Sequence, residues 1–155
     1  KRIGETALLA SEGVTAKQRL VKALQDKDSA VRYWAATGLG NIGKPAADTT
    51  EKLRALIKEE PSSVVRTAAA RALCRFDKSE FALPTLIHEL QHGAQWERLH
   101  AAIVLDQIEE QAKPVIPEMR KALEPRGDLY AKGKYVVRVI NRALNQLENT
   151  DRTVP

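Results

Sequence analysis

Apolar residues recur at every third or fourth position through most of the chain, the spacing that places them on one face of an α-helix. The clearest example lies between Asp26 and Gly43. Its apolar stripe consists of Val31, Ala35, Leu39 and Ile42. Asp28 or Ser29 is placed to cap the start of this helix, and Gly40 and Gly43 offer the left-handed backbone geometry that ends helices. The pattern therefore predicts an amphipathic helix across this stretch.

Pairs of such helices, each joined by a short turn, follow one another along the chain. They predict helical hairpins at about 15–43, 45–76, 79–109 and 113–148. A shorter helical candidate around Glu5–Ala10 comes before the first hairpin, and an insertion at Pro125–Lys134 is expected before the last helix, Tyr135–Leu147. The tail after Glu148 is expected to fray, as chain ends often do.

The hairpins also repeat one another residue by residue. A shift of 34 residues sets Val31-Arg32 on Val65-Arg66 and Leu39 on Leu73, a shift of 32 sets Arg98 on Arg66, and a shift of 33 sets Pro117 on Pro84. Two-helix units at this period indicate an all-α fold. We expect one domain across residues 1–155, a right-handed α-α superhelix (α-solenoid) of about four hairpins.

The repeated string V-R-x-x-A-A-x-x-L-G, which follows an Asp-containing turn, resembles the HEAT repeat in its short bacterial form. The Trp and Tyr positions of tetratricopeptide repeats and the T-P-L-H string of ankyrin repeats are absent. The resemblance implies that each hairpin buries one face in itself and another against its neighbours, so no single repeat is stable alone.

One arginine recurs directly after the turn of each hairpin. These arginines are Arg32, Arg66, Arg98 and Arg138. In a structural interpretation they form a ladder that binds acids or carbonyl groups of adjacent repeats, with Asp26, Asp28 and Glu97 as expected partners. In a functional interpretation they form a basic stripe for phosphate or sulfate groups. The sequence favours the ladder and leaves the stripe open.

The remaining conspicuous side chains are Tyr33, Trp34, Trp96 and His100. They either fill gaps between repeats or, if partly exposed on a concave face, anchor a partner, since aromatic residues and arginine are enriched in binding hot spots. Together with the four arginines they form the candidate interaction surface.

Composition changes this picture only slightly. Aromatic residues make up 5% of the chain and the net charge is +5. The basic excess permits a polyanionic partner, but such charge also confers solubility. We expect the basic residues to be mixed with Glu and Asp along every helix, so a strong phosphate-binding stripe is not predicted and nucleic acid is a disfavoured partner.

The segment His88-Glu89-Leu90-Gln91-His92 matches the HExxH string of the zincin metalloproteases, which places two imidazoles one helical turn apart to bind zinc. The repeat alignment argues against this function, because Leu90 falls on a core position while His88 and His92 fall on solvent-facing or turn positions. The position of a third ligand at metzincin spacing is occupied by Arg98. A zinc enzyme therefore stays a remote alternative, and no cofactor is predicted.

Cys74 is the single cysteine, so no internal disulfide can form, and its place on a packed helix predicts an inert buried thiol. No Gly-rich phosphate loop, Ser-His-Asp arrangement or membrane-length apolar run is found in the sequence. Because the chain begins at Lys1 without a methionine, we expect it to be a fragment of a longer protein.

Three longer strings, DKDSAVRYWAATGLGNIG, PSSVVRTAAARAL and ALPTLIHELQHGAQWERLHAAIVLDQIEEQAKPVIP, are similar to the HEAT-type extension that follows the catalytic domain of some bacterial sulfatases, of the heparan N-sulfatase-like or arylsulfatase kind. The resemblance covers about residues 15–147. It implies a C-terminal accessory region and, with it, a periplasmic or secreted location. The C/S-x-P-x-R motif of these enzymes is absent, since Cys74 is followed by Arg75-Phe76, so this chain is expected not to be an enzyme.

The sequence thus favours a non-catalytic HEAT-repeat scaffold that packs on a sulfatase catalytic domain in cis or holds another protein. The alternative is a solenoid that binds a polyanion, either a sulfated glycan or nucleic acid.

Overall fold

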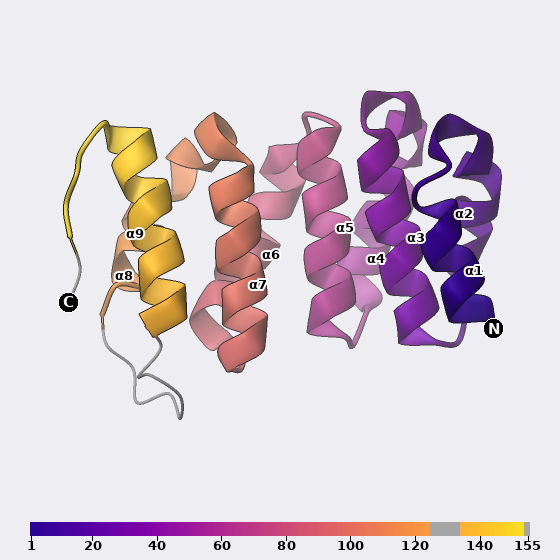
Figure 1. Ribbon diagram of the computed structural model, residues 1–155, viewed down its shortest axis with the longest axis horizontal. Coiled ribbons are helices and arrows are strands. Elements are labelled where there is room, and N and C mark those ends of the chain that lie inside the picture. The colour runs from indigo at the N-terminus through magenta and orange to yellow at the C-terminus, as the bar shows by residue number, and fades with distance from the viewer. Residues whose placement is uncertain (125–133, 154–155) are drawn as a thin grey trace. The chain divides into compact units, whose positions relative to one another are not determined.

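The structure, a computed structural model, describes residues 1–124 and 134–153, and every regular element in these residues is a helix (Figure 1). They divide into two compact units, Lys1–Thr85 and Leu86–Pro155. The all-α expectation is confirmed, and within each unit consecutive helices pack against one another as in an α-solenoid.

The first unit is built from two layers of helices. Its elements are α1 (Arg2–Leu9), the 3₁₀ helix η1 (Gly13–Ala16), α2 (Lys17–Ala23), α3 (Ser29–Ile42), the 3₁₀ helix η2 (Lys44–Thr49), α4 (Thr50–Glu59) and α5 (Ser63–Arg75). Figure 1 shows α1, α3 and α5 side by side, with α2 and α4 behind them, and the packing of α3 on α1 and α5 agrees with this view. Its core is built from small and branched side chains, among them Leu20, Leu39, Leu53 and Leu73, all without solvent exposure.

Helix α1 is longer and better packed than the sequence predicts. It starts at Arg2 and lies along α3, the place that the second helix of a preceding hairpin would take. The side-chain amide of Asn41 donates a hydrogen bond of 3.2 Å to the Ala10 carbonyl. A Cβ on Gly38 would lie 2.9 Å from the Cα of Ala10, so glycine is required for this close approach.

The two glycines that were expected to end α3 have different roles. Gly43 has a φ of 72° and caps the helix, as predicted. Gly40 instead lies inside the helix, where a Cβ would come within 3.1 Å of the Cα of Ala72 on α5. The expectation that Gly40 is a stop signal is therefore wrong, and its function is to let α3 and α5 approach each other closely.

Helix α6 (Ser79–His92) crosses the division between the units, and its last residues begin the second one. The other elements of the second unit are α7 (Gln95–Gln107), the 3₁₀ helix η3 (Glu109–Val115), α8 (Ile116–Lys121) and α9 (Lys134–Glu148). Helix α9 packs along α7 and also contacts α8 and η3. Most of the expected insertion at Pro125–Lys134 lies outside the described residues. The last helix begins and ends within one residue of its predicted bounds.

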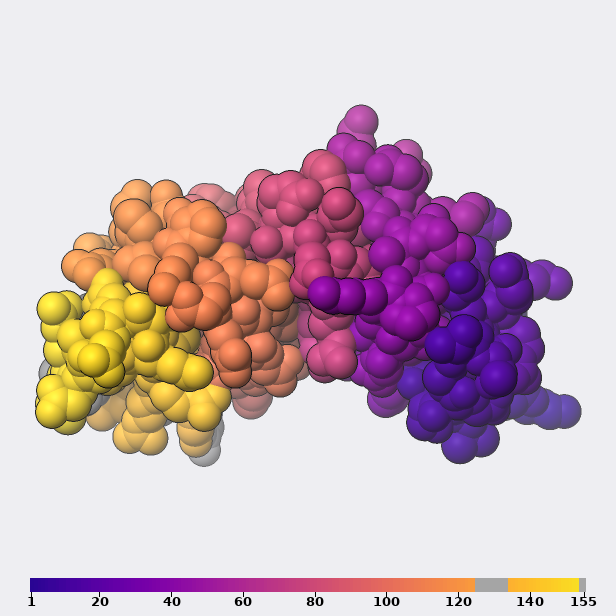
Figure 2. Space-filling view, turned by 90° about the horizontal axis from the view of Figure 1, so that it is seen from above, coloured from indigo at the N-terminus to yellow at the C-terminus, as the bar shows by residue number. Residues whose placement is uncertain are grey.

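The residues after α9 are hydrogen bonded to it, in contrast to the predicted fraying. Asn149 has a φ of 53°, which turns the chain back at the end of the helix. The side-chain amides of Asn141 and Asn145 each donate a 2.8 Å hydrogen bond to the Arg152 carbonyl. In Figure 2 this C-terminal segment, in yellow, is seen at the surface of the second unit.

None of the helices in residues 1–124 and 134–153 combines the length and the apolar character that a membrane crossing requires.

Candidate functional site

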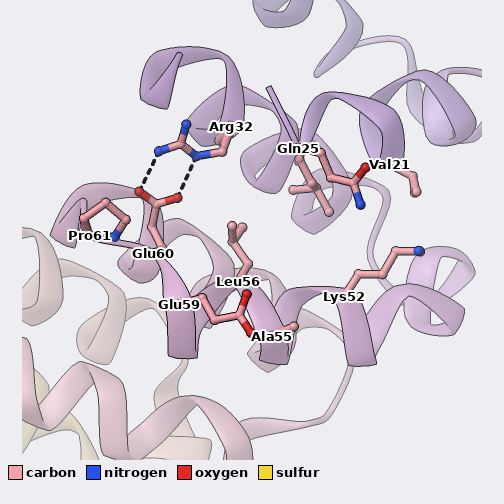
Figure 3. Close-up of a pocket in the computed structure, with 10 residues that line it drawn as sticks. Val21, Gln25, Arg32, Lys52, Ala55, Leu56, Glu59, Glu60 and Pro61 are labelled. Carbon is pink, nitrogen blue, oxygen red and sulfur yellow. Dashed lines mark hydrogen bonds and ion pairs between the residues drawn. The ribbon is translucent and has the colours of Figure 1, made fainter. Parts of the chain in front are cut away.

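A pocket of about 330 Å³ lies between α2 and α4 of the first unit, and we call it the α2–α4 pocket (Figure 3). Its lining consists of Val21, Leu24, Gln25, Arg32, Lys52, Ala55, Leu56, Glu59, Glu60 and Pro61. The walls are mainly apolar. In Figure 3 the guanidinium of Arg32 faces the carboxylate of Glu60, and two dashed lines join them.

This ion pair uses every nitrogen of the Arg32 guanidinium. Nε donates to Glu60 Oε2 at 2.6 Å, Nη2 donates to Glu60 Oε1 at 2.8 Å, and Nη1 donates to the Asp26 carbonyl at 2.7 Å. The Glu60 side chain is only 2% exposed and that of Arg32 is 15% exposed. A bidentate, largely desolvated arginine–carboxylate pair of this kind is strong and geometrically specific. Each nitrogen of Arg32 thus already donates one hydrogen bond within the protein.

The charges of the pair hold each other ionised. The hydrogen bond from Arg32 lowers the pKa of the Glu60 carboxyl, and the Ser62 backbone amide, which donates to Glu60 Oε1 at 2.9 Å, acts in the same direction. In return, the hydrogen bond to Glu60 raises the pKa of Arg32. The pocket therefore contains a closed ion pair at neutral pH and offers a ligand little net charge from these two residues.

Of the arginines that follow hairpin turns, Arg32 binds an adjacent repeat, as the ladder interpretation expects, whereas the hydrogen bonds that follow for Arg66 and Arg98 are made within their own hairpins. Arg32 reaches the acid Glu60 of the next hairpin. Arg66 Nη1 donates to the carbonyls of Glu60 and Pro61, both at 2.8 Å, and the buried Arg98 donates from Nε to the Leu90 carbonyl at 3.2 Å.

The expected partners were largely wrong. Asp26 contributes its backbone carbonyl to Arg32, Asp28 caps its own helix by accepting from the Ala30 amide, and Glu97 accepts from the Ala94 amide at the start of α7. The acid that the ladder uses, Glu60, was missed. Its signal was its place directly before Pro61, where the chain turns from α4 towards α5.

Arg138 has a different environment from the other three. It is exposed on α9 and lines a second pocket, of about 340 Å³, between that helix and the C-terminal residues. The lining of this α9 pocket consists of Arg138, Asn141, Arg142, Asn145, Arg152 and Thr153. Arg138 was predicted as a surface residue but the pocket was not, because the fold-back of the tail has no clear sequence signal.

The predicted aromatic anchors divide between the two units. Tyr33 and Trp34 are half-buried on α3, with their rings edge to face and their centroids 5.3 Å apart. Trp96 and His100 lie on α7, both exposed, and Trp96 has 67% of its surface accessible. None of these four side chains is fully buried between repeats, so the interpretation that they anchor a partner is retained for both pairs.

A further surface, the α3–α5 face, consists of Tyr33, Trp34 and Asn41 on α3 and of Arg71 and Arg75 on α5, and Arg71 Nη1 lies 3.5 Å from Asn41 Oδ1. Arg75 Nε donates to the Gly40 carbonyl at 2.6 Å, which ties α5 to α3. Burial lowers the pKa of Arg71, and the positive charge of Arg75 lowers it further. Arg71 and Arg75 were not among the predicted residues.

The α3–α5 face also corrects the expected mixing of charges. The segments SAVRYWAATGLGNI and SVVRTAAARALCR, which form α3 and α5, contain arginines but not one Asp or Glu. The acids that lie near these strings in the sequence belong to the turns, as the bounds of the two helices show. These two helices therefore contribute basic and no acidic side chains of their own to the surface.

The HExxH segment adopts a helix without the arrangement of a zinc protease. Leu90 is buried and both His88 and His92 are exposed, as the repeat alignment predicts, with ring centroids 5.0 Å apart. Glu89 is buried, in contrast to the imidazoles on either side of it. Within the described part of the chain, no group of three or more His, Cys, Asp or Glu side chains gathers in a way that could hold a metal ion.

Cys74 has no solvent exposure, and burial raises the pKa of its thiol to about 12. The thiolate form is the nucleophile in cysteine chemistry. This side chain is therefore a part of the core, as predicted.

Comparison with known proteins supports the repeat assignment. Residues 6–74 match the family model described as HEAT repeats, a span that runs from the second half of α1 to the penultimate residue of α5. The match and the packing of successive helices together support a HEAT-repeat helical solenoid, a class that commonly mediates protein interactions and is typically non-catalytic. A search of curated proteins found no match. The resemblance to sulfatase extensions gains no support from these comparisons.

Proposed function

We propose that this chain is a non-catalytic HEAT-repeat scaffold whose α3–α5 face binds an acidic segment of a partner protein. The observation that carries the proposal is the absence of any carboxylate from α3 and α5, beside two arginines and an aromatic pair. Aromatic residues and arginine are the side chains most enriched at binding hot spots.

The physical environment of the face explains the preference for an acidic partner. Arg71 is partly buried beside the like charge of Arg75, one helical turn away, and a carboxylate placed between them would offset that repulsion. The bond from Arg75 to Gly40 and the contact between Tyr33 and Trp34 fix part of the surface in advance. Such preorganisation reduces the entropy lost on binding.

Selection of short random peptides against the chain, followed by titration of the isotope-labelled protein, tests this proposal. We expect the selected peptides to be enriched in Asp and Glu and to shift amide resonances of α3 and α5. Arg71→Glu should weaken binding by about tenfold or more, because a charge-assisted contact becomes a repulsion. The control Lys58→Glu reverses a charge on the exposed side of α4 and should have little effect.

Two outcomes would overturn the proposal. The first is a set of selected peptides with no enrichment in acidic residues. The second is a binding site that maps away from α3 and α5, with equal responses to the Arg71 and Lys58 substitutions.

We further propose that the scaffold is the C-terminal accessory region of a bacterial sulfatase, where its partner would be the catalytic domain in cis and its location periplasmic or secreted. This finer proposal is supported by the three sequence strings alone. The test is the coding sequence upstream of Lys1. A C/S-x-P-x-R motif there supports the proposal, and an unrelated domain in that position refutes it.

A further inference from the structure

We infer that the α9 pocket binds a small oxyanion group, a phosphate or sulfate monoester. This inference does not rest on the proposed function, because the pocket belongs to the second unit and the α3–α5 face to the first. It starts from the observation that half of the lining residues are arginines and that none is acidic.

The three arginines of the pocket differ in how far their charge is compensated. Arg142 is paired with Asp106 of α7. Arg152 lies 3.8 Å from Glu148, a carboxylate that already binds Arg120. Arg138 has no hydrogen bond or ion pair with any other described residue. Among these described residues, two carboxylates thus face four arginines, so the group of six carries more positive than negative charge.

The pocket is assembled by specific hydrogen bonds. Besides the two amide donors to its carbonyl, Arg152 donates from its backbone N–H to Asn145 Oδ1 at 3.1 Å. The Thr150 hydroxyl donates to the same oxygen at 2.8 Å. Asn145 therefore acts as a clamp that brings the third arginine, Arg152, against the helix that carries the other two.

An oxyanion is the ligand that this arrangement fits best. Arg138 and Arg142 are one helical turn apart, a like-charge spacing that disfavours the helix unless an anion lies between the two groups. The planar guanidinium matches the geometry of phosphate and sulfate oxygens, to which it can donate two parallel hydrogen bonds. The volume of about 340 Å³ is at the lower end of the range for ligand sites, which suits one esterified group.

Calorimetric titration with phenyl phosphate and with phenyl sulfate at matched ionic strength tests the inference. We expect saturable binding with a stoichiometry of one for at least one of the two, and the difference between them identifies which ester is the better ligand. Arg138→Gln should weaken binding by about tenfold, equivalent to about 1.4 kcal/mol. Asn145→Ala should also weaken binding, because it releases the segment that carries Arg152.

The matched control is Lys121→Gln, which removes one exposed positive charge from the same unit outside the pocket. It should change the affinity by less than about twofold, since it alters only the long-range field. Failure of both esters to bind would refute the site. Equal losses in Arg138→Gln and Lys121→Gln would show attraction to net charge alone and would likewise overturn the inference.

Discussion

The α2–α4 pocket and the α9 pocket each contain an arginine that follows the turn of a hairpin, Arg32 in the first and Arg138 in the second. Arg32 meets the buried carboxylate of Glu60, which accepts two of its hydrogen bonds. Arg138 lines its pocket together with two further arginines, and no acid is among the described lining residues. The same repeat position can therefore stabilise the fold or remain available to a ligand, depending on whether a neighbouring segment supplies a carboxylate.

The largest difference between the pockets should be in stability. Glu60→Gln leaves the Arg32 charge largely buried beside a neutral group, and breaking a buried pair in this way should cost about 3 kcal/mol in the free energy of unfolding. Glu148→Gln in the second unit removes an acid whose partners, Arg120 and Arg152, are both more than half exposed, and should cost less than about 1 kcal/mol. Urea denaturation followed by circular dichroism measures both, and equal losses would contradict the comparison.

A smaller effect of the same ion pair should appear in acid. The pKa of Glu60 is lowered in the folded protein, so the pair contributes stability above the unfolded pKa of about 4.3 and loses it as the pH falls through the folded value. We expect the urea midpoint of the wild type to decrease over this range. Because Glu60→Gln lacks the titrating group, its midpoint should decrease less, and parallel curves would show that other carboxyls account for the effect.

The smallest expected effect is that of removing Arg138. Its side chain has no partner among the described residues, and its loss relieves the repulsion with Arg142, so Arg138→Gln should change the free energy of unfolding by no more than about 0.5 kcal/mol. The matched substitution Arg32→Gln should destabilise the first unit by several times that amount. The comparison fails if Arg138→Gln proves as destabilising as Arg32→Gln under the same denaturation conditions.

The sequence predicted the helices well because their period depends on local spacing. The start and stop of α3, with Asp28 as the N-cap and Gly43 at the end, are those that the capping preferences of these residues dictate. The buried Leu90 and the exposed imidazoles of the HExxH segment also follow from the repeat alignment.

What the sequence missed depends on contacts between distant segments. To predict Glu60 as the partner of Arg32, one must know how far apart neighbouring hairpins lie. To predict the role of Gly40, one must know its distance from Ala72. The α9 pocket depends on a single residue, Asn145, that holds the returning chain. The sequence of α3 and α5 contains no acid, but this could be recognised only once the bounds of the two helices were known.

The most direct test of the comparison is a nuclear magnetic resonance titration of the chain with phenyl phosphate in which the Nε–H signals of all arginines are followed together. We expect a saturable shift for Arg138, smaller shifts for its neighbours Arg142 and Arg152, and an unchanged signal for Arg32, whose Nε–H is already donated to Glu60. Equal shifts of Arg32 and Arg138, or a shift of Arg32 alone, would contradict it.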